Sequence, residues 1–222
     1  MHTVNSVLRA AEFLNERPRI KGSDTDAMRI TAAALFIASI PAQRPYHNFE
    51  HSMFVARIAQ VYMPPNSTAE DYTAVALAGL FHDAKHFHEN DVVNVATAQA
   101  TFRNWARAYP LHKSLLQRVD AYIGCTVFSH GEFPFDPPDG FAGCLRDADL
   151  SMSFFENSKH LIPKLAQEMG RPYDIDFIMG NMHFLKRQRY FSDIAFCQVN
   201  SSNWWLTIEL GLRKLLPETN EV

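Results

Sequence analysis

The sequence has little of several features that mark particular protein classes. It contains three cysteines, Cys125, Cys144 and Cys197, an odd number without the close pairs of a zinc ribbon or a redox motif. We expect them to be reduced residues in a helical core. The longest apolar run, Ala74 to Phe81, is far shorter than the roughly 20 residues that cross a bilayer. The sequence therefore predicts no membrane partner.

The chain also lacks an excess of charge of either sign. Its 222 residues include 21 Lys and Arg against 24 Asp and Glu, a formal net charge of -3. This balance provides no strong field for gathering a nucleic acid polymer, so a phosphate-bearing ligand would have to be held locally. The N-terminus shows no basic segment followed by an apolar core. These observations together predict a cytoplasmic protein.

Alternation with period two and internal repeats are missing as well. Apolar residues instead recur at helical spacing, and the hydrophobic content of 47% is enough for a substantial core. The expected fold is all-α, a compact multi-helix bundle in which residues 1–222 form one domain. Helices are expected at residues 5–14, 23–40, 49–62, 68–81, 91–108, 112–128, 145–169, 174–196 and 204–215.

Two short clusters, about thirty residues apart, carry most of the chemically informative side chains. The first contains His47 and His51, and the second contains His82, Asp83 and His86. Each lies beside an expected helix, with His51 in a first turn and His82 at a C-terminal end. Imidazole and carboxylate bind divalent ions such as Mn²⁺, Fe²⁺ or Zn²⁺, and a helix end holds them on a rigid backbone. The pattern predicts a shared metal site, and the alternative is a buried polar network without metal.

A third helix has to complete such a metal site. The charged segment from Arg146 to Asp149 interrupts an otherwise apolar stretch and offers two carboxylates. Asp147 and Asp149 lie about 200° apart around a helix, so only one of them is expected to face inward. From the residues alone, either can be the ligand and the other a surface charge.

The order of these residues resembles that of the HD superfamily of metal-dependent phosphohydrolases. Its motifs are most similar to the branch of cyclic-nucleotide phosphodiesterases. The resemblance implies the helical fold and one or two divalent ions (Mn²⁺, Mg²⁺, Fe²⁺ or Zn²⁺) that activate water for hydrolysis of a phosphoester. The matching segments are Tyr46-His47-Asn48 followed by His51, then His82-Asp83-x-x-His86-x-x-x-Asn90, and finally Ala148-Asp149-Leu150-Ser151.

The resemblance also implies roles for individual residues. The metal ligands would be His51, His82, Asp83 and Asp149. His47 would be the general acid, and Asp83 would act in catalysis as a bridge between ions. His86 and Asn90 fall on positions that contact the ligands or the phosphate. Gln198-Val199 partly matches a base-binding Gln-Val-Gly-Phe motif of the family, so Gln198 is a candidate substrate contact or, alternatively, a Gln on a helix surface.

The chemistry of these residues supports the same roles. Two ions that share a water lower its pKa toward neutrality and neutralise charge on a reacting phosphate. His47 could then protonate the departing oxygen, a step worth about 10² to 10⁴ in rate. The alternative for His47 is a residue at the start of a helix, hydrogen-bonded to backbone.

We therefore expect a hydrolase, either a phosphodiesterase or a phosphomonoesterase, that acts on a small phosphorylated substrate such as a nucleotide or cyclic nucleotide. A slot for the base could come from aromatic residues late in the chain. One alternative is a regulatory or sensor module that binds a nucleotide without turnover, and another is a helical bundle that ions only stiffen. The metal's identity and the oligomeric state stay open. The candidate aromatic residues are Phe133, Phe135, Phe191 and Trp204.

Overall fold

The computed structural model describes residues 24–42, 44–129, 131–155 and 160–200. These residues form nine α-helices and one 3-10 helix, and they include no β-strand, so the expected all-α bundle is confirmed. The elements are α2 (Asp24–Ser39), α3 (Phe49–Tyr62), α4 (Ala69–Phe81), α5 (Asp91–Ala108), α6 (Lys113–Gly124), α7 (Gly140–Leu150), the 3-10 helix η1 (Ser151–Phe154), α8 (Ile162–Glu168), α9 (Ile175–Arg187) and α10 (Asp193–Asn200).

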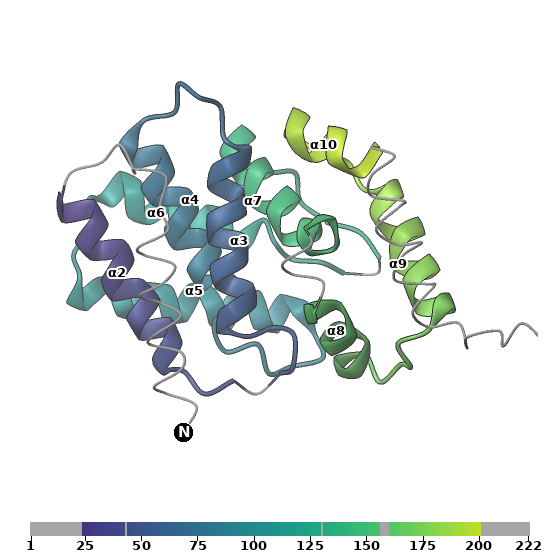
Figure 1. The fold of residues 1–222 in the computed structure, drawn as a ribbon. Helices are drawn as coiled ribbons and strands as arrows, with labels where there is room; N and C mark the ends of the chain where they lie inside the picture. The colour runs from purple at the N-terminus through teal and green to yellow at the C-terminus, as the bar shows by residue number, and fades with distance from the viewer. Residues whose placement is uncertain (1–23, 43, 130, 156–159, 201–222) are drawn as a thin grey trace, which may run out of the picture.

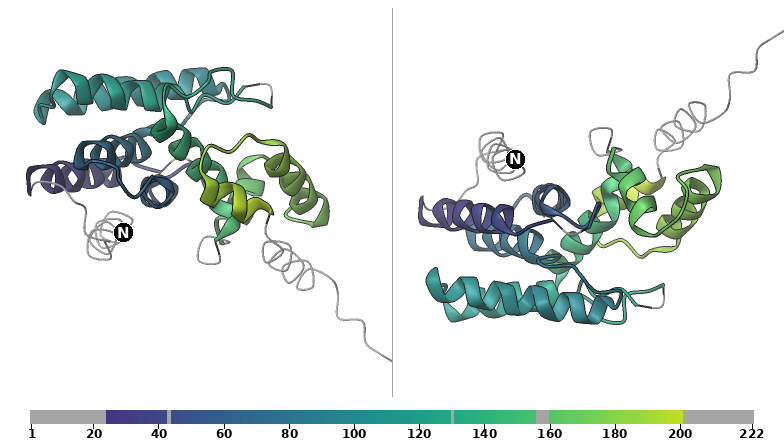
Figure 2. Two further views of the ribbon diagram at one scale, coloured as in Figure 1. Left: turned by 90° about the horizontal axis from the view of Figure 1, so that it is seen from above. Right: turned by 90° about the horizontal axis from the view of Figure 1, so that it is seen from below.

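The helices divide into two groups that meet at α7. Helices α2 to α6 lie on one side of the molecule and α8 to α10 on the other, as Figures 1 and 2 show. The largest apolar core joins α2 to α7. Two smaller apolar clusters hold α8, α9 and α10 together and involve Met152 of η1 and Tyr46. A cavity lies between the two groups, and its lining includes the C-terminal ends of α4 and α7, the start of α5, and residues of α8 and α9.

Helix α4 runs through the core because its sequence is apolar on all sides. Every residue from Thr73 to Phe81 is buried. The helix begins with a capping box, in which the Oγ1 of Thr68 accepts from the N–H of Asp71 and the Asp71 carboxylate accepts from the N–H of Thr68. Its C-terminal end consequently delivers His82 and Asp83 into the interior.

Gly79 lets α4 and α3 approach each other closely. A Cβ atom added at Gly79 would lie 2.6 Å from the Cα of Ala56. We expect Gly79→Ala to lower the free energy of unfolding by about 1–3 kcal/mol, since backbone has to move to relieve the overlap. Gly180→Ala, in α9, is the control because its added Cβ meets no atom within 4 Å, and it should stabilise the protein by about 0.5–1 kcal/mol. Urea unfolding measures both, and equal effects would contradict the close approach.

The prediction of one helix from 145 to 169 was wrong. Helix α7 ends at Leu150, the hydroxyl of Ser151 donates to the carbonyl of Ala148 at 2.8 Å, and η1 follows. The next residue, Phe155, has an extended backbone. Helix α8 begins only at Ile162, with a proline in its first turn, where the missing N–H has no cost. Apolar spacing continues across this break, which is why the pattern concealed it.

Two other predicted helices are shorter than expected. The range 174–196 contains two helices, because Gln188 is extended and separates α9 from α10. The range 112–128 ends early, at Gly124 of α6. The helices predicted at 5–14 and 204–215 lie outside the described residues.

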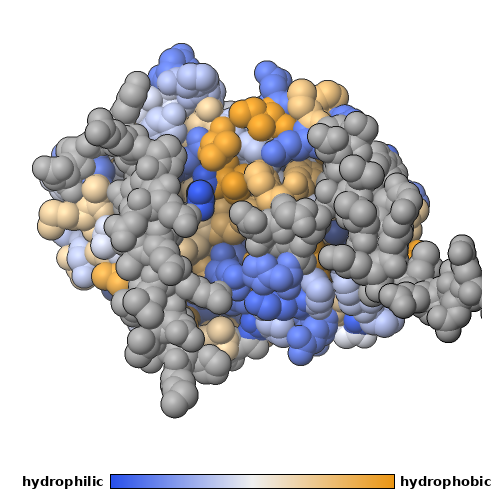
Figure 3. Space-filling model, in the orientation of Figure 1, coloured by the Kyte–Doolittle hydropathy of each residue, from blue (hydrophilic) through white to orange (hydrophobic). Residues whose placement is uncertain are grey.

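The surface carries apolar residues in one part of the face drawn in Figure 3. Hydrophobic residues gather there near the C-terminal end of α3, and the lower middle of the same face is hydrophilic. Exposed apolar side chains include Val61 of α3 and Phe196 of α10. Among the described residues, no helix has both the length and the apolar character needed to cross a membrane.

Candidate metal centre

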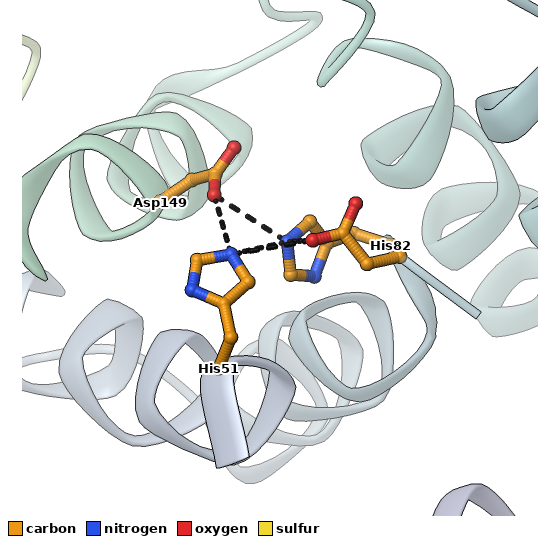
Figure 4. A group of neighbouring side chains, drawn as sticks. His51, His82 and Asp149 are labelled. Carbon is orange, nitrogen blue, oxygen red and sulfur yellow. Dashed lines mark hydrogen bonds and ion pairs between the residues drawn. The ribbon is translucent and has the colours of Figure 1, made fainter. Parts of the chain in front are cut away.

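Three helices direct polar side chains at one point (Figure 4). His51 projects from the first turn of α3, His82 from the end of α4 and Asp149 from the end of α7. The start of α3 is held by Asn48, whose side-chain oxygen accepts from the N–H groups of Glu50 and His51 at 2.8 and 3.3 Å. This cap determines where the His51 ring enters the interior.

The tips of the four predicted ligand residues lie close together. His51 Nε2 is 3.0 Å from Asp149 Oδ1 and 3.2 Å from Asp83 Oδ2. His82 Nε2 is 2.9 Å from the same Asp83 oxygen and 3.3 Å from His51 Nε2. One ligand atom of each residue lies within 4.8 Å of all the others. The structure therefore brings His51, His82, Asp83 and Asp149 together in a group that could hold a metal ion.

The surroundings of this group fit a cation. His82 Nδ1 lies 2.8 Å from the carbonyl oxygen of Gly79. Because a carbonyl oxygen can only accept a hydrogen bond, Nδ1 carries a proton and donates it, which leaves the lone pair of Nε2 for a metal ion. Asp83 Oδ2 is buried, and it lies close to the ring nitrogens of His51 and His82. Two imidazole nitrogens and two carboxylate oxygens around one point are donors that divalent ions accept.

The charges in this group stabilise one another strongly. Burial alone would raise the pKa of Asp83 and Asp149, but His82 and the other nearby imidazoles hold both below their usual range. Burial alone would lower the pKa of His51 and His82, and these two carboxylates raise both instead. The carboxylates therefore attract positive charge, and a metal ion has to displace the protons that otherwise supply it.

Asp147 faces away from the ligand group, as expected for one of two residues spaced on opposite sides of a helix. Its Oδ2 accepts from the backbone N–H groups of Phe191 and Ser192 at 2.8 and 2.6 Å. The side chain is fully buried, and burial raises its pKa to about 6. Asp147 thus fastens the segment before α10 to α7, while Asp149 joins His51 and His82.

This contact predicts different stabilities for two variants of Asp147. Asp147→Ala leaves two backbone N–H groups without their acceptor, and each buried unsatisfied donor costs about 1–3 kcal/mol. We expect a loss of about 2 kcal/mol or more in the free energy of unfolding. Asp147→Asn keeps an accepting oxygen and removes a buried charge, so its stability at neutral pH should stay near that of the unsubstituted protein. Urea unfolding compares the two variants. Equal losses in the free energy of unfolding would show that the accepting oxygen of Asp147 does not account for its contribution to stability.

A second group of polar side chains adjoins the first. His47 Nδ1 lies 2.5 Å from Glu168 Oε1, and Glu168 Oε2 accepts from the N–H groups of Tyr46 and His47 at 3.0 and 3.2 Å. Burial raises the pKa of Glu168, but His47 outweighs this effect and lowers it to about 2. Sequence reasoning missed Glu168, which is 121 residues from His47 and matches no motif used above. The predicted acid therefore has a carboxylate that orients its ring.

His86 stacks on His47. Their ring centroids are 4.1 Å apart and their planes differ by 5°. Although His47, His86 and Glu168 have ligand atoms within 4.8 Å of one another, parallel rings cannot aim their in-plane lone pairs at one ion. This second group is therefore a poor metal site.

Two other predicted residues lie away from the ligand group. Asn90 is exposed, and its side chain accepts from the N–H of Val92 as the cap of α5. Gln198 of α10 accepts from the hydroxyl of Tyr62 at 2.6 Å and does not line the cavity described below. The asparagine that contacts His86 is Asn94, whose Nδ2 lies 3.0 Å from His86 Nε2.

A cavity of about 590 Å³ opens onto both polar groups. His82, Asp83 and Asp149 contribute to its lining at one end, and α8 and α9 contribute apolar residues. The cavity therefore lies where the two groups of helices meet. Its aromatic walls come from separate segments and include Phe128, Phe133 and Phe184.

Among the residues that the structure describes, the aromatic side chains that were predicted to form a slot for the base do not come together at the cavity. Phe133 lines the cavity and lies under the guanidinium of Arg146, which is 3.8 Å from its ring centroid. Phe135 is 58% exposed, and Phe191 packs near the same Arg146. Neither of these two is among the described residues that line the cavity. Trp204 lies outside the described residues.

The site thus combines a group that could hold a metal ion, an imidazole with an orienting carboxylate, and a cavity of small-molecule size. The possible ligands come from α3, α4 and α7, and the carboxylate that contacts His47 comes from α8. Comparison with known proteins gave no match: no family model, no curated protein and no solved structure is significantly similar to this chain.

Proposed function

We propose that this protein is a metal-dependent phosphohydrolase that cleaves a phosphoester of a nucleotide or cyclic nucleotide. The observation that carries the proposal is the convergence of four ligand-type side chains, from three helices, at the lining of a cavity that His47 also lines. A helical bundle that needed ions only for stiffness would not require the cavity or the histidine beside the ligands.

The residues around the cavity have distinct tasks in this proposal. His51, His82, Asp83 and Asp149 would hold a divalent ion, which when bound supplies a water of lowered pKa and neutralises charge on a phosphate. His47 would give its proton to the departing oxygen from Nε2, since Nδ1 is directed at Glu168. Glu168 keeps the ring in that orientation.

The charge of the cavity supports a role for metal. Its described lining contains four carboxylates, Asp83, Glu89, Asp91 and Asp149, against one guanidinium, Arg171. A phosphate ester is itself an anion, so these carboxylates repel it unless positive charge on the imidazoles of the lining or a bound metal ion offsets them. A divalent ion among the four ligand residues would reverse this effect at the end where the reaction is proposed.

The size and walls of the cavity support a small organic phosphate as the substrate. Sites for small molecules typically enclose about 300–1,000 Å³ and combine apolar walls with a few polar groups. The cavity of about 590 Å³, whose lining includes four phenylalanine side chains, fits this description. A planar base could pack on these rings while its phosphate lies at the ligand group.

The test is hydrolysis by protein that has been stripped with a chelator and reloaded with Mn²⁺. Bis-p-nitrophenyl phosphate reports diester cleavage and p-nitrophenyl phosphate reports monoester cleavage, and a panel of linear and cyclic nucleotides then identifies the substrate. We expect turnover only after reloading, together with a higher melting temperature, because an ion that binds the folded state stabilises it.

The controls separate the proposal from its alternatives. Asp136→Asn alters a carboxylate whose side chain is 87% exposed, and it should leave turnover unchanged. Absence of turnover on every substrate with the metal fully loaded would reject the hydrolase. Tight nucleotide binding in that case would favour a regulatory module, and a metal-dependent melting temperature without nucleotide binding would favour a structural ion.

A further inference from the structure

The side-chain amide of Asn94 has one possible orientation. Its Oδ1 accepts from the backbone N–H groups of Phe87 and His88 at 3.1 and 2.8 Å, and its Nδ2 donates to the carbonyl of His88 at 2.8 Å. If the amide oxygen and nitrogen were exchanged, the NH₂ group would face the two backbone N–H groups, and the oxygen would face the carbonyl of His88. All three hydrogen bonds would then be lost. Asn94 is 2% exposed, so water cannot replace them.

This orientation determines which nitrogen of His86 carries a proton. Asn94 Nδ2 also lies 3.0 Å from His86 Nε2. An amide nitrogen only donates, so His86 Nε2 has to accept with its lone pair. The ring proton is then on Nδ1, which lies 3.1 Å from Asp83 Oδ1. Asn94 therefore donates a hydrogen bond to His86, and His86 donates one to Asp83.

We propose that Asn94 is a positioning residue that holds His86 in the tautomer whose Nδ1–H donates to Oδ1 of Asp83. The other carboxylate oxygen, Oδ2, is thereby directed at His51 and His82. Partners of this kind orient metal ligands and raise the affinity for the ion. A contribution of Asn94 to catalysis rests on the proposed function, whereas the tautomer of His86 follows from the hydrogen bonds alone.

The tautomer can be read directly from the unsubstituted protein. Two-bond ¹H–¹⁵N correlation spectra of histidine-labelled protein distinguish a protonated ring nitrogen from an unprotonated one. Spectra are recorded with a chelator and again with Zn²⁺, which is diamagnetic. His86 is assigned from the signal lost in His86→Gln and, independently of any variant, from contacts between its ring protons and the Asn94 amide.

We expect protonated Nδ1 and unprotonated Nε2 for His86 under both conditions. Protonated Nε2 in the unsubstituted protein would overturn the inference, whether or not the protein hydrolyses phosphoesters. An inactive protein with the expected tautomer would reject the proposed function and leave this inference intact. The two failures are therefore distinguishable.

Variants of Asn94 test the cause of the tautomer. Asn94→Asp presents an acceptor to His86, so a proton should appear on Nε2. Asn94→Ala should lose the single tautomer and weaken Zn²⁺ binding by about 10-fold, measured by competition with a chelating dye. Thr97→Ala, one turn along α5, should change neither. An unchanged His86 spectrum in both Asn94 variants would show that another group selects the tautomer.

Discussion

Replacing Asp149 by alanine will abolish metal-dependent hydrolysis while the helical bundle stays folded. The variant removes the only proposed ligand from α7, which lies 3.0 Å from His51 Nε2 and 3.4 Å from His82 Nε2. Without a bound ion there is no water of lowered pKa, so the loss should exceed the roughly 10² to 10⁴ that a general acid contributes. The measurements are kcat/KM with saturating Mn²⁺ and the metal content of the dialysed protein.

Two comparisons decide whether metal loss is the cause. Asp149→Asn keeps the size of the side chain but removes its charge, and we expect it also to lose most of its metal. Asp147→Asn alters the neighbouring carboxylate that binds backbone instead, and it should retain the ion. Turnover by Asp149→Ala at the rate of the unsubstituted protein, with Mn²⁺ saturating, would reject the proposed ligand set.

Replacing His47 by glutamine will slow the hydrolysis of a nucleotide far more than that of a p-nitrophenyl ester. A sugar hydroxyl is a poor leaving group and needs a proton as it departs, whereas p-nitrophenolate leaves readily without one. We expect kcat for the nucleotide to fall by about 10² to 10⁴, and kcat for bis-p-nitrophenyl phosphate to fall much less. Metal content should not change, because His47 is not among the four proposed ligands.

Glu168→Gln provides the matched variant for this experiment. The carboxylate is replaced by an amide of the same size, so His47 keeps a neighbour but loses the charge that its Nδ1 contacts. We expect kcat to fall less than in His47→Gln. The fall should again be larger for the nucleotide than for the p-nitrophenyl ester. Equal losses on both substrates, or loss of metal in His47→Gln, would show that His47 supports binding or folding instead of proton transfer.

Much of the helical structure followed from local sequence. Helices α3 and α5 begin and end at the predicted residues, Phe49–Tyr62 and Asp91–Ala108, because apolar spacing is regular there and an asparagine caps each start. The predicted helices were too long where apolar spacing continues past a break in the structure, as at Ser151 and at Gln188. Side-chain capping and extended backbone at such points are short-range features that apolar spacing does not register.

The sequence by itself determined the residue types and the order of the proposed ligands, because motif spacing and helix ends are local properties of the chain. Only the tertiary structure decided which partners complete the site. Glu168 reaches His47 through the packing of α8, and Asn94 reaches His86 through the turn before α5. Contacts between such segments depend on how helices pack and how buried polar groups find partners, and no local pattern of residues encodes that.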